Sequence, residues 1–411
     1  METNYQVMYR VSLVLSVNGN SYNVPTSDIM SITIIHNYDG MTFPIIRVRL
    51  YCELSLIQNI VEYPDEIEMV GNLEGNVYRL NSDQSKPMVV DGATPIKFNL
   101  KAYIENKNIP TSVMDQYRNG KKITTDMNQA PKATIELYGY NQSLVYYLKR
   151  QVESIYHNMG LTSIIQNMMG HNRITNYTMS PLNQQSCFDQ ILIPNLNLMQ
   201  ALAFFDTYYG LYEKGCSVYG DLDKLYICNA SSSISDEKNS SILIKKASSE
   251  SDMVGLQKYN GSYMMNVLYN NISLLSESDI ERLMQAKNIG AINVNTNEIQ
   301  SANLQELYQY KTNEIFGDDN IPSILHKYVN PFIASSNAAR IKEKITKVDM
   351  SFTGFDIGSI NVGHRFTLTF DDAIRGRNLN GSFRPIFANH VIINQDDDLF
   401  IASTSIQLCQ N

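Results

Sequence analysis

The stretch QVMYRVSLVLSV, residues 6–17, decides the fold of this chain. Its apolar side chains occupy every odd position, which are Val7, Tyr9, Val11, Leu13, Leu15 and Val17. Because successive side chains of a strand point to opposite faces of a sheet, this period of two predicts a strand with one buried face. The next residues, Asn18-Gly19-Asn20, favour the left-handed dihedral angles of a tight turn. The chain is therefore expected to open with a β-hairpin.

Further strands are predicted along the first third of the chain. Alternating apolar residues place them at 31–36, 45–52, 96–104 and 133–140. The polar stretch from Leu80 to Pro95 is expected to be a long loop. Residues 1–140 are therefore predicted to form a mostly antiparallel β domain.

The hydrophobic period changes after this region. Apolar residues at helical spacing predict a helix over 144–155 and a short second one over 161–169. A third helix is expected over 198–209, where Asn197 and Gln200 have the spacing of a capping box. The middle of the chain is thus partly helical.

A hairpin is predicted after the third helix. Its strands are expected at 216–219 and 224–228. Together with the helices, it makes residues 141–245 an α/β middle domain. The Ser-rich stretch 231–251 marks the boundary with the next region.

The last part of the chain returns to strand-like alternation. Residues 276–330 are polar with short helical clusters and predict a helical insertion, and Pro331 can start another helix. Residues 246–411 are therefore predicted to be a second β domain with that insertion. The predicted fold class is α+β, with two β-rich domains flanking an α/β middle domain. The expected strands are 263–269, 348–352, 366–370, 386–393 and 400–408.

Charge and hydropathy restrict the partners of the chain. Its 33 Lys and Arg against 41 Asp and Glu give a net charge of −8, which argues against specific nucleic-acid binding. The chain has no run of 18 apolar residues that would insert in a membrane, and residues 1–20 lack the apolar cluster of a secretory signal. We therefore expect synthesis in a reducing cytoplasm.

The cysteines and histidines indicate no metal or disulfide framework. The five cysteines are odd in number and include no CxxC pair, so reduced, mostly buried thiols are expected. The six histidines are scattered, without an HExxH or HxH motif. These residues are Cys52, Cys187, Cys216, Cys228 and Cys409, and His36, His157, His171, His326, His364 and His390.

Three further patterns were weighed as sites. Gly210 and Gly215 have the glycine spacing of a phosphate-binding loop, but no Lys follows the second glycine and a helix precedes the first. Asp221 and Asp223, and the run 396–398, lack the other oxygen donors of a calcium loop. No catalytic, cofactor-binding or metal residue is assigned, and no cofactor or enzymatic activity is expected. A β-rich sequence without recognisable catalytic or ligand-binding motifs favours a structural role.

The segment 191–231 resembles the baseplate hub proteins of contractile phage tails. Ile191-Leu192-Ile193-Pro194 leads into the helix that ends in Tyr208-Tyr209-Gly210-Leu211-Tyr212, and the hairpin around 221–227 follows. Residues 361–370 look like that family's strand entered through a tight turn, although Asn361-Val362 stands where a Pro is frequent. Residues 387–391 and 400–408 look like its closing hairpin.

The resemblance implies a role in the virion. The two β regions would be copies of a tail-tube-like domain, and a homotrimer would form a ring that joins the sixfold tail tube to the threefold central spike. The ring would be part of the DNA ejection channel, and DNA would pass it without specific binding. Its partners would be the tail tube protein, the central spike protein and other baseplate proteins, and it would lie in the tail baseplate after synthesis in the host cytoplasm.

Two other functions stay open from the sequence. One is a tail-associated peptidoglycan hydrolase, and the other is a carbohydrate-binding adhesin, against which the absence of Trp counts. In the hub interpretation, subunit interfaces are expected at strand edges and at loops such as Leu80–Pro95.

Overall fold

The structure is a computed structural model that describes most of the chain. The described residues are 4–38, 43–80, 87–104, 132–222, 224–229, 239–245, 255–268, 272–274, 292–293, 298–299, 330–332, 347–370, 380–396 and 398–410. Most of its secondary structure is strand. One sheet has sixteen strands, and three small sheets have three, two and two strands.

The large sheet takes strands from both ends of the chain. Its first eight are β1 (Asn4–Val17), β2 (Asn20–Val24), β3 (Ile29–Asn37), β4 (Ile45–Glu53), β5 (Ile67–Leu80), β6 (Met88–Gly92), β7 (Ile96–Ile104) and β8 (Lys132–Tyr140). The others are β14 (Asn239–Lys245), β15 (Gly255–Tyr259), β16 (Ser262–Leu268), β17 (Ile272–Leu274), β20 (Lys347–Thr353), β21 (Arg365–Phe370), β22 (Gly381–Asp396) and β23 (Leu399–Gln410).

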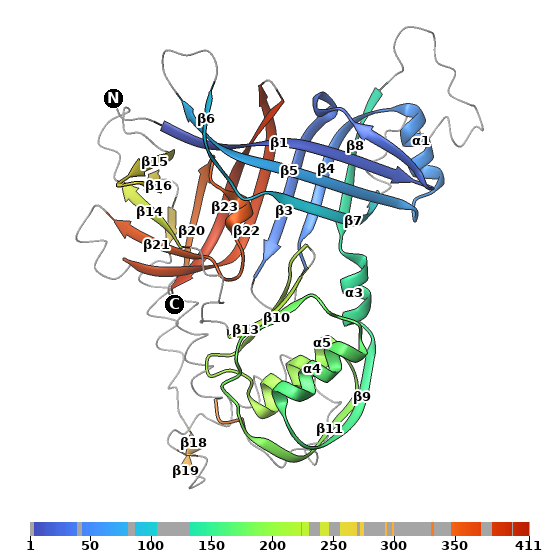
Figure 1. Cartoon of the computed structure of the whole chain (residues 1–411), viewed down its shortest axis with the longest axis vertical. Helices are drawn as coiled ribbons and strands as arrows, with labels where there is room; N and C mark the ends of the chain where they lie inside the picture. The colour runs from blue at the N-terminus through green and yellow to red at the C-terminus, as the bar shows by residue number, and fades with distance from the viewer. Residues whose placement is uncertain are drawn as a thin grey trace.

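Eleven of these strands form a closed circuit. Its order is β1-β15-β16-β14-β21-β22-β3-β4-β8-β7-β5, and it closes because β5 pairs with β1. Strand β23 crosses the circuit, since it pairs with β1 as well as with β22. Figure 1 shows these strands together as the upper body of the molecule.

Strand β1 organises the core of this body. It pairs antiparallel with β5 over its whole length, from Asn4 opposite Leu80 to Val17 opposite Ile67. The six apolar residues at its odd positions are all buried, so the predicted strand and its buried face are confirmed. Asn18 and Gly19 have positive φ angles of 48° and 74°, and they form the turn into β2.

Helices occur mainly in the middle of the chain. The helices are α1 (Leu54–Glu62), α3 (Gln142–Leu148), α4 (Leu161–His171), α5 (Leu198–Phe204), the π-helix η3 (Phe205–Tyr209) and the 3-10 turns η1 (Thr26–Asp28) and η6 (Ile357–Ser359). The predicted capping box is confirmed, since the Asn197 side chain accepts from the Gln200 N–H while the Gln200 side chain accepts from the Asn197 N–H. The predicted helix over 161–169 is confirmed by α4.

The middle of the chain has a hydrophobic core of its own, formed by buried residues between Leu144 and Ile227. Its strands are β9 (Gln151–Gly160), β10 (Tyr177–Met179), β11 (Cys187–Asn197), β12 (Cys216–Gly220) and β13 (Leu225–Asn229). Strands β9 and β11 form a long two-stranded antiparallel sheet that curves around α4 and α5 in the lower body of Figure 1. Strands β12 and β13 form the predicted hairpin.

The predicted α+β class, with two β domains flanking a separate middle domain, is wrong. The structure is mostly β, and strands of the first and last parts share one sheet and one core. Strand β22 lies antiparallel to β3, with Phe387 opposite Asn37 and Ile393 opposite Ser31. Such pairing between distant segments leaves no local pattern in the sequence, because alternation predicts a strand without its partner.

Three local predictions also need correction. The helix predicted over 144–155 ends at Leu148, and β9 follows because pairing with β11 overrides the helical spacing. The stretch 276–330 holds no described helix; its described residues include β18 (Ile292–Asn293) and β19 (Glu298–Ile299), and most others lie outside the described residues. The predicted loop Leu80–Pro95 contains β6, while residues 81–86 lie outside the described part.

Candidate functional site

The two glycines of the suspected phosphate loop serve packing and turns. Gly210 follows the π-helix η3 with φ 73°, and a Cβ atom there would lie 2.2 Å from Oδ1 of Asn330. The Asn330 side chain donates to the carbonyl oxygens of Asp206 at 2.8 Å and Thr207 at 3.1 Å. The glycine thus makes room for a distant segment of the chain, and Gly215 lies in the turn that leads to β12.

The acidic residues of these turns act as hydrogen-bond acceptors within the chain. Oδ1 of Asp221 accepts from the N–H of Leu222 at 2.8 Å, directly after β12. Asp398 has a positive φ of 63° in the turn before β23 and accepts a hydrogen bond from the Thr26 hydroxyl. Asp223 and Asp397 lie outside the described residues.

The cysteines are all free thiols, and no disulfide joins them. Cys52, Cys228 and Cys409 are buried, Cys216 is half-buried and Cys187 is exposed. Burial raises the pKa of Cys52 to about 12 and that of Cys228 to about 11. The thiols of Cys52 and Cys228 therefore stay protonated at neutral pH.

Two of the six histidines meet inside the molecule. His36 on β3 and His390 on β22 are both buried, with ring centroids 5.7 Å apart. Nδ1 of His36 is hydrogen bonded to the hydroxyl of Tyr219 on β12 at 2.5 Å, and the Tyr38 ring stacks on the imidazole at 5.4 Å. Nδ1 of His390 is hydrogen bonded to the Thr404 hydroxyl at 3.0 Å. We call His36, His390 and Tyr219 the histidine cluster.

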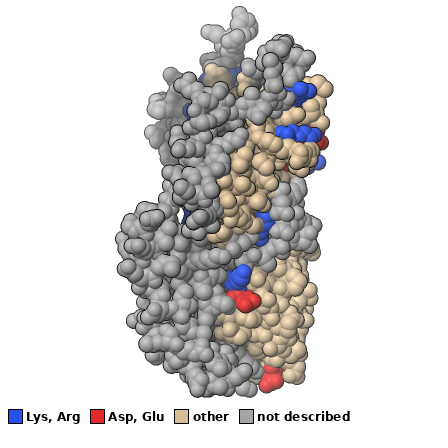
Figure 2. All heavy atoms as spheres, turned by 90° about the vertical axis from the view of Figure 1, so that its left-hand side faces the viewer, with Lys and Arg blue, Asp and Glu red and all other residues tan. Residues whose placement is uncertain are grey.

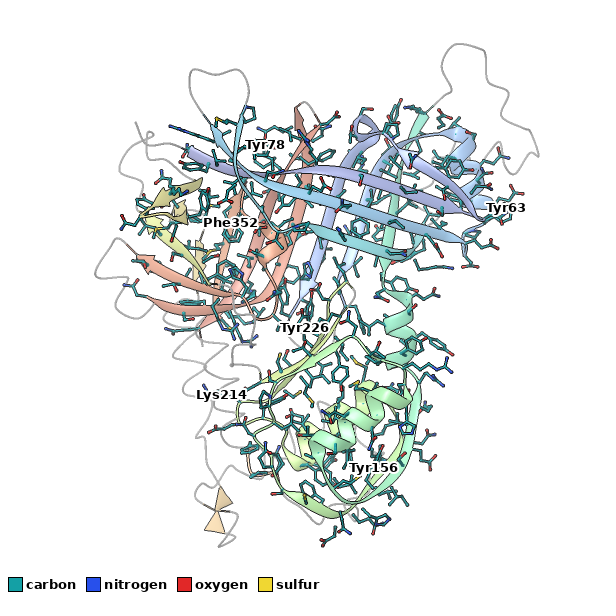
Figure 3. All side chains as sticks on the ribbon, viewed as in Figure 1. Tyr63, Tyr78, Tyr156, Lys214, Tyr226 and Phe352 are labelled. Atoms are coloured by element: carbon teal, nitrogen blue, oxygen red, sulfur yellow. The ribbon has the colours of Figure 1, made fainter. Side chains whose placement is uncertain are left out.

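The histidine cluster joins the sheet to the middle of the chain. Tyr219 belongs to β12, whereas both histidines belong to the large sheet. Tyr226, labelled in Figure 3 where the two bodies meet, stacks on Tyr219 with centroids 6.2 Å apart. Ser217, also on β12, donates its hydroxyl to the Tyr38 carbonyl at 3.0 Å. The cluster thus lies at a joint between two hydrophobic cores.

Burial shifts the ionisation of this cluster toward neutral forms. It lowers the pKa of His36, against the opposing field of Asp221. It lowers the pKa of His390 well below its ordinary value, and the neighbouring His36 adds to this shift. The pKa of Tyr219 is raised well above its ordinary value, chiefly by burial and then by Asp221. At neutral pH the cluster is therefore an uncharged hydrogen-bonded group.

The cluster does not form a metal centre. Within the described residues no three His, Cys, Asp or Glu side chains come together as metal ligands. Of the other histidines, His171 bonds the Asn167 carbonyl at the end of α4, His157 lies on β9, and His326 is outside the described residues. His364 is buried and hydrogen bonded at both ring nitrogens.

Sequence reasoning missed the meeting of the two histidines, although a signal for their burial exists. His36 continues the buried phase of Ile32 and Ile34 on β3, and His390 lies between the buried Ala388 and Ile392 on β22. The pattern thus shows that each side chain faces the core. It does not show that β3 and β22 are neighbours.

The edge strand β6 exposes apolar side chains. Met88, Val89 and Val90 are 57%, 49% and 40% exposed. Among the described strands β6 pairs only with β5. Apolar edge strands are covered in most native proteins because their free N–H and C=O groups bind other chains. This edge is therefore a candidate interface.

A row of stacked side chains crosses the outer face of three strands. Tyr103 on β7 stacks on Tyr138 on β8 with centroids 5.4 Å apart, and the Arg47 guanidinium of β4 lies 5.1 Å from the Tyr138 ring. Tyr and Arg are enriched at protein interfaces. On the side of the molecule drawn in Figure 2, the described atoms are mostly uncharged, with a few Lys and Arg near the top.

Comparison with known proteins places the chain in a bacteriophage protein family. Its residues 4–392 match the family described as Bacteriophage PBS1 gene 109 protein, and the chain belongs to this family. The resemblance to tail baseplate proteins noted in the sequence is confirmed.

Solved structures of tail proteins match nearly the whole chain, but at low sequence identity and low structural similarity. The 43 kDa tail protein of prophage MuSo2 from Shewanella oneidensis is 12% identical over 96% of this chain and 97% of its own, with a TM-score of 0.45. A tail protein from Neisseria meningitidis MC58 is 9% identical over 98% of this chain and 97% of its own, with a TM-score of 0.49. Because similarity is this weak, the assignment depends on the family match.

Two further searches gave negative results. No curated protein sequence matches the chain. Among the described helices, none has both the length and the apolar character needed to cross a membrane.

Proposed function

We propose that this protein is the trimeric hub of a phage tail baseplate. Three chains form a ring that joins the sixfold tail tube to the threefold central spike and contributes to the DNA ejection channel. Its partners are the tail tube protein, the central spike protein and other baseplate proteins, and it reaches the virion after synthesis in the host cytoplasm. The family match over residues 4–392 is the observation that carries this proposal.

The exposed edge strand supports assembly into a ring. The apolar residues of β6 (Met88, Val89 and Val90) face solvent in the single chain. A neighbouring chain in a closed ring would cover them and would remove the open edge. We therefore place a subunit contact at β6.

The acidic balance fits a channel through which DNA passes without binding. The net charge of −8 repels a polyanion at long range. Such repulsion favours transit over adhesion.

We also propose that the protein acts structurally and not as a peptidoglycan hydrolase. Strands of the first and last parts of the chain are built into one sheet, and helices and strands of the middle share the second core. A zymogram on cell-wall material tests this proposal, since a cleared band from the purified protein would overturn it.

The mass of the purified protein tests the hub. Light scattering after size exclusion should give about 140 kDa, three times the 46.7 kDa of one chain. Negative-stain microscopy should show an annulus. If a monomer persists even when tube and spike proteins are added, the proposal is wrong.

A further inference from the structure

We propose that the histidine cluster is an acid-sensitive latch between the large sheet and the middle of the chain. At neutral pH it holds β12 against the strands of the large sheet that carry the two histidines, and protonation of the histidines in acid releases this contact. The proposal concerns a joint within one chain, so it does not depend on the hub function.

The geometry at His390 gives the first reason. Its Nδ1 is hydrogen bonded to Thr404, and its Nε2 is buried without a hydrogen-bond partner among the described residues. A neutral imidazole tolerates this arrangement, because one nitrogen then carries no proton. A protonated ring would place an N–H at Nε2, where no acceptor meets it, and a buried donor without a partner is costly.

The closeness of the two rings gives the second reason. The rings of His36 and His390 are 5.7 Å apart, so two protonated imidazoles would repel each other in a site of low dielectric constant. His36 also bonds across the joint to Tyr219 at 2.5 Å. Charging this pair therefore acts directly on the contact between β3 and β12.

Charged and titratable groups from neighbouring segments also face the histidine cluster. Asp221, after β12, favours a proton on His36, and its Oδ1 lies 3.5 Å from the Tyr219 hydroxyl. This attraction is smaller than the opposing effect of burial, which lowers the pKa of His36. Among the described residues, the other titratable groups in ring contact with the cluster are Tyr38, directly after β3, and Tyr226 on β13.

The direction of the pH effect follows from these shifts. Because burial lowers both histidine pKa values, the folded joint binds fewer protons than the open one. The joint is fully stable above the ordinary histidine pKa of about 6.5 and is weakened as the pH falls below it. Acid thus opens the joint before it affects the rest of the sheet.

His364 is the matched internal control. It is as buried as His390, but Nδ1 is bonded to the Ser359 carbonyl at 3.0 Å and Nε2 to the Ser240 hydroxyl at 3.0 Å. Both partners can accept a hydrogen bond, so a protonated His364 loses no contact. Its replacement should leave the acid response of the joint unchanged.

Hydrogen exchange of the full chain at pH 7.5 and 5.0, corrected for the intrinsic rates, tests the latch. In the wild type, protection of β12 should fall about tenfold or more at pH 5.0, the factor that corresponds to one pKa unit, while β1 and β5 keep theirs. The double variant His36→Asn/His390→Asn keeps a side-chain amide near each Nδ1 and should lose this response, whereas His364→Asn should retain it. Equal loss in β12 and β5, or an unchanged response in the double variant, would overturn the proposal.

A second measurement needs no variant. Deuterium exchange at the imidazole C2 atoms of the wild-type protein, followed by mass spectrometry, gives a titration midpoint for each histidine peptide. The midpoints of His36 and His390 should lie below the ordinary value of about 6.5. Ordinary midpoints at both positions would show that the cluster accepts protons freely, and the latch would be rejected.

Discussion

The carboxylate of Asp356 binds Thr94 through two groups at once. Asp356 Oδ1 and Oδ2 accept from the Thr94 backbone N–H at 3.2 Å, and Oδ2 also accepts from the Thr94 hydroxyl at 2.9 Å. The next residue, Ile357, donates its N–H to the Tyr9 hydroxyl at 2.9 Å. Residues 262 positions apart thus fasten the last part of the chain to the first, beside strand β1.

Asp356→Ala should lower the free energy of unfolding by about 1.5–3 kcal/mol, because hydrogen bonds to a charged acceptor are lost and the Thr94 groups stay half-buried. Chemical denaturation measures this change. Asp349→Ala is the control, since Asp349 bonds Gln407 on an exposed face and its removal should cost less than about 0.5 kcal/mol. Equal losses in the two variants would show that the Asp356 contact does not hold the halves together.

Gly358→Ala should disrupt the same contact by steric overlap. A Cβ atom at Gly358 would lie 2.3 Å from the carbonyl oxygen of Thr94, so the backbone must move. We expect a loss of about 1–3 kcal/mol in unfolding free energy. Gly170→Ala has the opposite sign: its Cβ meets no atom within 4 Å and it lies in helix α4, where Ala is favoured over Gly by up to about 1 kcal/mol. Thermal unfolding of both variants checks the pair.

Local alternation predicts many of the strands of this fold but not their partners. The period of two in β1 locates its buried face correctly. Helical spacing of apolar residues, in contrast, predicts a helix that continues beyond the end of α3 at Leu148. Val152 and Ile155 fall at helical spacing by coincidence. Ile155 is 54% exposed and lies opposite Leu192 in the antiparallel pair of β9 and β11. The helix α1 and the long strand β5 were not predicted at all.

The candidate sites show the same division. Gly210 has the glycine spacing of a phosphate loop, and in the structure this glycine accommodates the side chain of Asn330. The histidine cluster depends on the pairing of β22 with β3 and on the position of β12, and both are tertiary relationships. Within this cluster, His36 and Tyr219 lie 183 residues apart in the sequence. No local spacing could bring them together.

Gly210 and Asn330 should show strong energetic coupling. Asn330→Ala removes two hydrogen bonds to the end of the π-helix and should cost about 1–3 kcal/mol. Gly210→Ala adds a Cβ 2.2 Å from Asn330 Oδ1 at a positive φ of 73° and should also destabilise. In the double variant the overlap with the Asn330 side chain disappears, and only Phe332 Cδ2 stays within 2.9 Å of the added Cβ. The combined loss should therefore be smaller than the two single losses together by about 1 kcal/mol or more. Additive losses in denaturation would contradict this contact.

Thiol reactivity should follow burial. Cys187 is exposed at the start of β11 and should react rapidly with a disulfide reagent at pH 8. Cys52 and Cys228 are buried with pKa values raised to about 12 and 11, so their thiolates are scarce at that pH. Cys187→Ser should remove the fast phase of the reaction, and full labelling should need denaturant. If two thiols still react rapidly after this substitution, at least one of them is a buried cysteine, because Cys216 is the one half-buried thiol that remains. That result would contradict the prediction.

The edge strand β6 should decide assembly if the proposed ring is correct. Met88→Lys/Val90→Lys places two charges on exposed positions of this edge, where lysine discourages pairing with another strand. We expect the trimer near 140 kDa to fall to the mass of one chain, 46.7 kDa, in light scattering. The melting temperature of the dissociated chain should stay within a few degrees of the wild-type value, because surface substitutions change stability by about 0.5 kcal/mol or less.

The control Tyr146→Ser changes a side chain that is 63% exposed on helix α3, away from the sheet edge, and should leave the trimer intact. A trimer that persists in the lysine variant would move the subunit contact to another surface, whereas a wild-type chain that never assembles would contradict the hub itself.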